Sequence, residues 1–289
     1  MNIQNQNLLF SVIIPTYNRV ETLLECLNLL QPFNLELKNI SYEIIVSDDS
    51  TNDESEKVIK EKFPNVIWVK GPKKGPAANR NNGASFSKGE WLVFTDDDCL
   101  PQRNFLSAYL ASINLNHESL TFEGAIEPTN EAEFKNSDKY ECPVNVTGGN
   151  FWSANICIRK SLFDEIGGFD LNYPNAALED QDIFYRLSER TTIPFVKDSV
   201  VLHPYRLIDF ENKLKKIPAQ ARDWAYHAVK HKERFHFQNK FFIFSDSIKF
   251  YSKDFVRQIS KGRIKIATFN LCYLFIGNFW LGYYLLKNK

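Results

Sequence analysis

Residues 90–101 read Glu90-Trp91-Leu92-Val93-Phe94-Thr95-Asp96-Asp97-Asp98-Cys99-Leu100-Pro101, an apolar run that ends abruptly in three consecutive carboxylates. The run from Trp91 to Phe94 predicts a short buried strand. Three like charges at the tip of a core strand repel one another, so we expect a positive charge to compensate them. A divalent cation is the simplest compensation, because its charge is often the largest in a site.

Successive side chains of an extended chain point to opposite faces, so Asp96 and Asp98 are predicted to face one side, about 6–7 Å apart at the backbone. Mg²⁺ takes oxygen ligands and usually binds one or two carboxylates together with substrate phosphates. Asp98 is therefore the predicted direct ligand of Mg²⁺ or Mn²⁺, and Asp96 is predicted to hold a metal-bound water or a ribose hydroxyl. Asp97 is predicted to point away and to cap a helix that begins near Pro101.

The composition narrows the class of protein. The 289 residues hold 35 Lys and Arg and 35 Asp and Glu, so nothing in the net charge favours nucleic acid as a partner. The five cysteines include no CxxC pair, which predicts buried free thiols in a reducing compartment. Residues 1–7 are polar and lack a long apolar segment, so we expect no secretory signal and a cytoplasmic protein.

Apolar runs and helical patterns alternate along the first 205 residues. The runs at 8–15, 43–47, 66–69, 91–94, 120–126, 151–158, 194–197 and 199–203 predict strands, and the patterns at 19–30, 53–62, 77–87, 101–114, 161–166 and 178–190 predict helices. The first strands are apolar on both faces and follow a strand–helix order. This pattern predicts a parallel sheet covered by helices.

Polar residues follow three of these strands: Tyr17-Asn18, Asp48-Asp49 and Asp96 to Asp98. In open α/β sheets, ligands bind outside the carboxyl ends of the strands. Since the ends of parallel strands share one edge of the sheet, we expect these three groups to meet in space.

In this arrangement the sequence resembles glycosyltransferase family 2, the inverting enzymes with a GT-A fold. The motifs occur in family order over roughly residues 9–205: Ser11 to Arg19, Glu43 to Thr51, Gly75 to Gly83 leading into Lys88-Gly89-Glu90, Asp96 to Asp98, Gly167 to Asp170, and Glu179 to Asp182. The resemblance implies an α/β fold of Rossmann-like type, with a mostly parallel sheet flanked by helices.

The resemblance also implies an activity. It implies that a sugar moves from a nucleotide-diphosphate donor, with inversion and with Mn²⁺ or Mg²⁺, to a hydroxyl of a saccharide or lipid-linked saccharide. Asp49 matches the position that reads the base. A carboxylate only accepts hydrogen bonds, and uracil, thymine and guanine all offer an N–H, so a CMP-sugar is disfavoured. The resemblance implies a UDP- or dTDP-sugar before a GDP-sugar. A turn or helix cap is the alternative role for Asp49.

Other positions of the resemblance border the same donor. Pro15 and Tyr17 are expected at the base or ribose, beside Asp96, although a packed aromatic also fits Tyr17. Arg80 is expected to contact the base or the diphosphate, and a surface salt bridge is its alternative.

Asp180 is the expected general base, because inversion in one step needs a carboxylate to take the proton of the acceptor hydroxyl. Glu179 is expected to orient the acceptor or to stabilise the loop. Acidic residues also favour helix N-termini for structural reasons, and the helix dipole is expected to lower the pKa of Asp180.

Three further residues complete the expected site. His203 ends the last core strand, where some GT-A enzymes place a third metal ligand or a phosphate contact; a structural histidine is the alternative. Gly149 and Trp152 are expected to border the donor sugar and the acceptor, because glycine permits close approach and a tryptophan can stack on a sugar. A packed core tryptophan fits Trp152 equally well.

The chain beyond residue 207 lies outside the resemblance. We expect residues 1–207 to form the catalytic domain and residues 208–289 a helical, aromatic-rich extension. Residues 266–286 carry no charge and are flanked by Lys and Arg, so this segment is interpreted as a helix packed on the catalytic domain, an interfacial helix or a membrane span. Basic and aromatic residues favour association with the inner face of the membrane.

Two other functions compete with a transferase used in surface polysaccharide assembly, a pathway that rests on analogy. A sugar nucleotidyltransferase would need a glycine-rich, basic loop near the N-terminus, and Pro15 to Asn18 is not one. A catalytically inactive nucleotide-sugar-binding or membrane scaffold protein would bind UDP without transferring any sugar.

Overall fold

The computed structural model describes residues 9–36, 40–129 and 139–287, so the N-terminal segment 1–7 considered above lies outside the described residues. The chain divides into two compact units. The first runs to Thr129 and resumes over Cys142–Pro204. The second begins at Tyr205 and also takes in the short strand β7 (Tyr140–Glu141).

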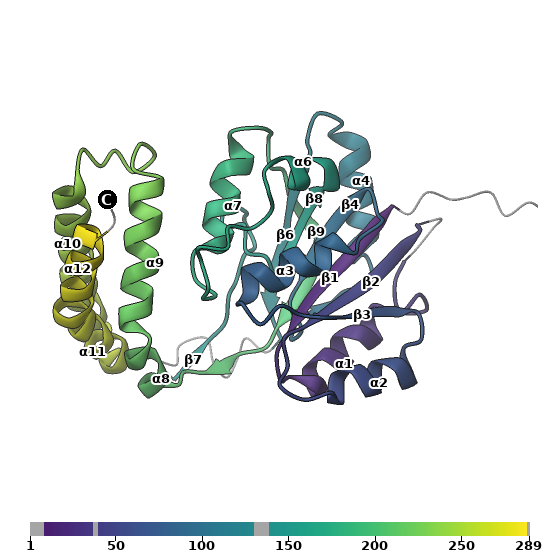
Figure 1. The fold of residues 1–289 in the computed structure, drawn as a ribbon, viewed down its shortest axis with the longest axis horizontal. Coiled ribbons are helices and arrows are strands. Elements are labelled where there is room, and N and C mark those ends of the chain that lie inside the picture. Colours follow the sequence, from purple (N-terminus) through teal and green to yellow (C-terminus); the bar gives the residue numbers. More distant parts are fainter. Residues whose placement is uncertain (1–8, 37–39, 130–138, 288–289) are drawn as a thin grey trace, which may run out of the picture. The chain divides into compact units, whose positions relative to one another are not determined.

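The first unit is built on an eight-stranded sheet with the order β3-β2-β1-β4-β8-β6-β9-β5 (Figure 1). Its elements are β1 (Phe10–Thr16), α1 (Val20–Leu29), β2 (Tyr42–Asp48), α2 (Glu54–Lys62), β3 (Val66–Lys70), α3 (Pro76–Ser85), β4 (Trp91–Thr95), β5 (Leu100–Pro101), α4 (Phe105–Leu115), β6 (Thr121–Pro128), β8 (Asn155–Arg159), α6 (Lys160–Glu165), α7 (Glu179–Ser188) and β9 (Phe195–His203).

The sheet is mixed and mostly parallel. Strands β3, β2, β1 and β4 are parallel, as the apolar runs predict, and β9 is parallel to β6. Strand β8 runs antiparallel between β4 and β6, and β5 runs antiparallel to β9. The sequence does not reveal these reversals, because a buried apolar run looks the same in either direction.

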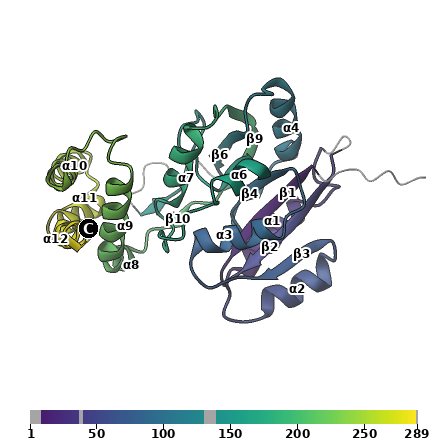
Figure 2. The same ribbon diagram turned by 45° about the horizontal axis from the view of Figure 1, so that its top comes forward.

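The side chains of each strand alternate between two hydrophobic layers. Val12 and Ile14 of β1 pack with side chains of α1, α2 and α4 on one face, and Ile13 packs with α3, α6 and α7 on the other. Figure 1 shows α1 and α2 together on one side of β1–β3, and α4 lies beside β9 in both views (Figures 1 and 2). Both faces of the sheet are covered, so polar sites are left to its edges and strand ends.

The second unit is helical, with a small antiparallel pair of strands. It contains β10 (Arg206–Leu207), which pairs with β7, followed by α8 (Phe210–Lys215), α9 (Ile217–Lys230), α10 (Lys240–Ser260), α11 (Ile264–Cys272), the π-helical turn η1 (Tyr273–Gly277) and α12 (Asn278–Lys287). Helix α12 packs on α9, and α11 packs on α10. Side chains such as Ile217, Ile243 and Leu281 form a core of their own.

Several boundaries differ from the sequence prediction. Helix α4 begins at Phe105 because Leu100–Pro101 first pairs with β9, and β9 is one strand where two were predicted. The strand predicted over 151–158 begins only at Asn155. Phe151 adopts a left-handed backbone with φ of 51°, and Glu123 holds this part of the chain.

Glu123 of β6 is buried and accepts hydrogen bonds from a whole loop. Asn145 Nδ2 and the N–H groups of Asn150 and Phe151 donate to its Oε1, and the N–H of Gly149 donates to its Oε2 at 2.6 Å. A buried N–H group that is left without an acceptor destabilises the fold. One carboxylate therefore fixes the loop that leads into β8.

We expect Glu123→Gln to lower the free energy of unfolding by about 1–3 kcal/mol, because the amide turns an N–H toward at least one of these donors. Chemical denaturation measures the change. Glu118→Gln, at an exposed position just before the same strand, is the matched control and should change stability by less than about 0.5 kcal/mol. Equal stability of the two variants would contradict the anchoring role.

Candidate active site at the carboxyl edge of the sheet

The ends of β1, β2 and β4 meet at one edge, as predicted. Thr16 joins them: its carbonyl oxygen accepts from the N–H of Asp49 at 3.0 Å, and its hydroxyl donates to Asp97 at 2.7 Å. Asn79 of α3 also donates to the Thr16 carbonyl at 3.3 Å and to that of Ser47 at 2.9 Å. Groups from distant parts of the sequence are thus held in one place by buried hydrogen bonds.

The three acids after β4 do not alternate as an extended strand would. The N–H of Cys99 donates to the carbonyl of Asp96 at 3.1 Å, which closes a turn. Asp97 and Asp98 lie 3.2 and 3.1 Å from the same Nη1 of Arg19, whereas Asp96 pairs with Arg80. The prediction that Asp96 and Asp98 share a face while Asp97 points away is therefore wrong.

Asp97 does not cap a helix. It is buried, it accepts from Thr16, and the residue before α4 is Asn104. Burial raises the pKa of Asp97 to about 6, against the opposing charge of Arg19. Asp97 belongs to the ionic network of the site.

Arg80 lies buried among carboxylates. Its Nη2 is 2.8 Å from Asp96, its Nη1 is 3.2 Å from Glu179, and its guanidinium lies 5.7 Å from the centre of the Phe169 ring. A surface salt bridge is excluded, because only 5% of Arg80 is exposed. The same cation joins α3, the turn after β4 and the start of α7.

Glu179 and Asp180 begin α7 side by side. Burial raises the pKa of Glu179 to about 7, and the charge of Asp180 adds to the rise. Burial also raises the pKa of Asp180, although Arg80 and a contact with Ser153 oppose it. The expected lowering by the helix dipole is therefore wrong, because loss of hydration outweighs it.

The two carboxylates differ in their partners. Glu179 accepts from Arg80 and, at 2.7 Å, from the N–H of Ala177, so both of its oxygens are engaged within the chain. This favours the loop-stabilising alternative for Glu179. In contrast, Oδ1 of Asp180 is buried and has no hydrogen-bond partner among the residues that the structure describes.

Asp98, Cys99 and His203 form a cluster whose ligand atoms lie within 4.8 Å of one another. His203 Nδ1 is 2.8 Å from the carbonyl of Pro204, which can only accept, so Nδ1 carries a proton. Its Nε2 lies 3.6 Å from Asp98 Oδ1. In a neutral ring the Nε2 lone pair faces a carboxylate oxygen there, an arrangement that suits a cation between them.

The donor set fits Mn²⁺ or Mg²⁺ through Asp98 and fits Mn²⁺ through His203, because carboxylates suit both ions and imidazole suits transition metals. Cys99 is a poor third ligand, since thiols suit softer metals and burial raises the pKa of its thiol.

Two residues proposed for the nucleotide differ in exposure. Tyr17 is 57% exposed, so it is not a packed core aromatic, and it follows the half-buried Pro15 of β1. Asp49 is buried and its Oδ1 accepts from the N–H of Lys73 at 2.7 Å. The Cβ of any other residue at position 71 would lie 2.2 Å from this oxygen, so Gly71 leaves room for the carboxylate.

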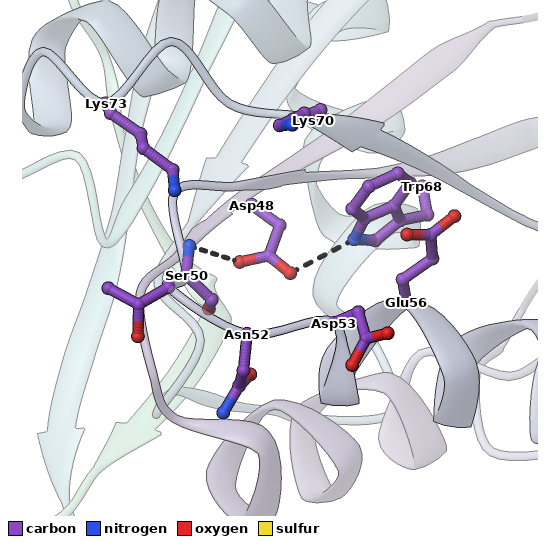
Figure 3. Close-up of a pocket in the computed structure, with 9 residues that line it drawn as sticks. Asp48, Ser50, Asn52, Asp53, Glu56, Trp68, Lys70 and Lys73 are labelled. Carbon is purple, nitrogen blue, oxygen red and sulfur yellow. Dashed lines mark hydrogen bonds between the residues drawn. The ribbon is translucent and has the colours of Figure 1, made fainter.

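Asp48 has a structural role. Its carboxylate accepts from the Trp68 indole N–H at 3.1 Å and from the N–H of Ser50 at 2.8 Å, in a hollow beside α2 (Figure 3). Lys70, Lys73 and Glu56 also line this hollow, and Asp96, Asp98 and Asp180 are not among the described residues that line it.

Gly149 and Trp152 lie on the loop that Glu123 holds. Gly149 has φ of 91°, a backbone conformation that favours glycine, and an added Cβ would meet no protein atom within 4 Å. The expected place of Gly149 beside the donor sugar stays a prediction. Trp152 is half-buried and packs against the core, which favours the structural alternative.

The sequence analysis missed Arg19 and Ser153. Arg19 directly follows Tyr17-Asn18 at the predicted edge, so its position was a usable signal. No sequence signal pointed to Ser153, because its contact with Asp180 joins a turn before β8 to the start of α7, two segments that are distant in the sequence.

Comparisons with known proteins agree on one family. A family model described as glycosyl transferase family 2 matches residues 11–167, just over half of the chain. The glycosyltransferase AglE of Haloferax volcanii is 26% identical over 222 residues, covering 71% of this chain and 69% of that protein. The chain spans about two thirds of the length of the first curated relatives that it matches.

Solved structures share the fold. TarS 1–349 of Staphylococcus aureus, in complex with UDP-GlcNAc, matches with a TM-score of 0.56 and 20% identity, over 74% of this chain and 65% of that chain. Mannosyltransferase PcManGT from Pyrobaculum calidifontis, in complex with GDP-Man and Mn²⁺, matches with a TM-score of 0.61 and 15% identity, over 97% and 88%. The fold is the expected GT-A fold with a helical C-terminal extension.

We expect Arg19→Gln to lower the melting temperature of the metal-free protein by about 2 °C, because Asp97 and Asp98 lose their shared cation and the pair is half-exposed. The variant should also bind Mn²⁺ more tightly, with a larger rise of its melting temperature on adding the ion. Arg190→Gln, which breaks the exposed pair with Glu165, is the control. An identical response of all three proteins to Mn²⁺ would show that Arg19 does not balance the acidic turn.

Proposed function

The chain belongs to glycosyl transferase family 2, and from this premise we propose that it is an inverting, metal-dependent glycosyltransferase that uses a UDP- or dTDP-sugar. The acceptor is a hydroxyl of a saccharide or lipid-linked saccharide. One observation carries the proposal. Arg80 forms ion pairs with Asp96 and with Glu179, which is next to Asp180 in the sequence. The buried Oδ1 of Asp180 has no hydrogen-bond partner among the described residues. A carboxylate oxygen kept in this way is suited to accept a proton.

Donor binding is assigned to the edge formed by β1, β2 and β4. The exposed ring of Tyr17 can stack on the base, next to Pro15. Asp49 can accept an N–H of the base with its second oxygen, since Lys73 already donates to the first. Asp96, held by Arg80, lies where a ribose hydroxyl or a metal-bound water would be oriented. In this arrangement Arg80 acts on the nucleotide through Asp96.

The choice of base follows from the chemistry of Asp49. A carboxylate needs an N–H, which uracil, thymine and guanine offer and the ring N3 of cytosine lacks. The two solved structures named above hold UDP-GlcNAc and GDP-Man. Family resemblance favours UDP- or dTDP-sugars here.

Asp98 and His203 are the residues that would hold Mn²⁺ or Mg²⁺. The bound ion supplies Lewis-acid stabilisation of the departing diphosphate. His203 is oriented for this role by the Pro204 carbonyl. Arg19, which is 47% exposed at its side chain, can move as the charge around Asp98 changes.

Asp180 acts as the general base. Its carboxylate takes the proton of the acceptor hydroxyl as that oxygen attacks the anomeric carbon. The new carbon–oxygen bond forms opposite the bond to the diphosphate, which breaks as the nucleoside diphosphate leaves with the electron pair, so the configuration inverts. Glu179 and Ser153 position this carboxylate, and the lipid-linked acceptor places the reaction at the cytoplasmic face of a membrane.

We expect Asp180→Asn to lower turnover by about 10²–10⁴-fold, because the general base is lost, while donor affinity stays close to that of the wild type. The donor is the UDP- or dTDP-sugar that raises the melting temperature most in the presence of Mn²⁺. Release of UDP or dTDP from it, by transfer to acceptor or to water, measures turnover.

Asp164→Asn, at an exposed position on α6, is the matched control and should behave as the wild type. Normal turnover of Asp180→Asn would remove Asp180 from the mechanism. If the wild-type protein binds the nucleotide sugar yet releases no UDP or dTDP, the alternative function of an inactive binding protein would be supported instead.

The rate should depend on pH with a defined sign. Burial raises the pKa of both Glu179, to about 7, and Asp180, so the pair keeps a proton at pH values where ordinary carboxyls, with a pKa of about 4, are ionised. The base must be unprotonated, so the acidic limb of kcat/KM should lie at a higher pH than an ordinary carboxyl would give.

A pH–rate profile at saturating Mn²⁺ tests this expectation. Glu179→Gln removes a carboxyl that shares the charge of Arg80 with Asp180, so Arg80 should lower the pKa of Asp180 further and move the acidic limb to lower pH. A limb near the ordinary carboxyl value in the wild type would contradict the effect of burial.

A further inference from the structure

The C-terminal helical segment carries no charged residue between its two ends. Helices α11, η1 and α12 follow one another without a break over Ile264–Lys287, 24 residues that are long and apolar enough to cross a membrane. Residues 266–286 contain no Asp, Glu, Lys or Arg. Ala267, Tyr273 and Leu281 are buried in the core of the second unit, so only one side of the helix faces outward.

That side is a stripe of large apolar residues at helical spacing. It consists of Ile264 (57% exposed), Leu271 (39%), Phe275 (68%), Phe279 (70%), Tyr283 (46%) and Leu286 (84%). A helix that packs on one side normally carries charged or polar residues on the other. Exposed Thr268 lies between Ile264 and Leu271, so the stripe is unbroken from Leu271 to Leu286. An exposed apolar stripe of this length marks an interaction surface.

The buried side does not fit a membrane span. Asn270 Nδ2 donates to Asp254 of α10 at 2.6 Å, and Arg257 and Gln258 also contact this carboxylate. Helix α10, which packs against α11, carries exposed Lys249 and Lys253. Placing this unit in hydrocarbon would bury several charges at high cost, so only the stripe itself can enter an apolar phase.

The charge around the stripe indicates what covers it. Residues 239–287 hold eight Lys and Arg and two Asp and Glu, although the whole chain has a formal net charge of zero. Lys261, Arg263 and Lys265 stand at one end of the stripe and Lys287 at the other. Basic residues beside an apolar helix face complement anionic lipid headgroups.

We propose that the stripe from Ile264 to Leu286 docks on an anionic lipid bilayer, with the helix lying in the plane of the membrane surface. The aromatic and aliphatic side chains enter the headgroup region, and the flanking basic residues contact lipid phosphates. This surface specifies how the enzyme is held at the membrane. It does not depend on the proposed transferase activity, because its evidence lies in the second unit alone.

Co-flotation of the full-length protein with vesicles tests the proposal. Wild-type protein should bind vesicles of phosphatidylcholine with 30% phosphatidylglycerol, and bind pure phosphatidylcholine much more weakly. The double variant Phe275→Ser/Phe279→Ser should bind the anionic vesicles at least about tenfold more weakly, because it loses two aromatic side chains that would be buried in the bilayer. Phe33→Ser/Leu115→Ser, at residues of the first unit that are 77% and 82% exposed, is the matched control and should bind as the wild type.

A second variant, Lys261→Glu/Arg263→Glu/Lys265→Glu, keeps the apolar stripe and should also lose binding. Melting temperatures and the shift with UDP and Mn²⁺ show that each variant is folded, and they separate failure of this proposal from failure of the proposed activity. Wild-type binding to both vesicle types that resists alkaline carbonate would indicate a span and overturn the proposal. Unchanged binding of the Phe275/Phe279 variant, or a dimer that this variant dissociates, would also overturn it.

Discussion

The ion pairs of Arg80 are the constraint on which the site depends. A buried guanidinium lies between Asp96 and Glu179, residues that are 16 and 99 positions away in the sequence. Removing these charges from water costs free energy that the pairing must offset, and loss of one partner would leave the others uncompensated. The same cation therefore fixes three elements at once: α3, the turn after β4 and the N-terminus of α7. Asp180 is held near Asp96 at the carboxyl edge of the sheet because Glu179, its neighbour in the sequence, belongs to this network.

A second arginine divides the acidic turn. Arg19 shares its Nη1 between Asp97 and Asp98, while Asp96 turns to Arg80. The buried Arg80 thus pairs with the first acid of the turn, and the half-exposed Arg19 pairs with the second and third. The network around Arg80 is mostly buried, although 26% of the Asp96 side chain is exposed, and it holds Asp96 and Glu179 in place. The group around Asp98 borders His203 and Arg19, whose side chain is 47% exposed, so this half of the network is open to solvent.

The sequence predicted the parallel strands, the meeting of their ends and the family, because apolar runs and short polar motifs depend on local chemistry. It could not predict which acid faces which cation. Asp97 was predicted to cap a helix because residues 96–98 were assumed to be extended. The sequence does not show that they form a turn, since the turn depends on ion pairs with distant arginines. The pKa of Asp180 was expected to fall, since a helix start is visible in sequence and burial is not. The positive φ of Gly149 also emerged only from the structure of the loop that Glu123 holds, and its expected place beside the donor sugar stays a prediction.

For the helix at 264–287, too, the sequence alone does not show which side chains are buried, so it leaves the relation to a membrane open. Its composition fits a packed helix, an interfacial helix and a span, because hydropathy counts side chains without regard to where they point. The contact between Asn270 and Asp254 separates these interpretations. A polar pair on the inward side ties the helix to α10, which carries exposed Lys249 and Lys253, while the outward side of the helix is largely apolar. A membrane span would bury the charges of α10, so these contacts favour the proposed position of the helix along the boundary between water and lipid.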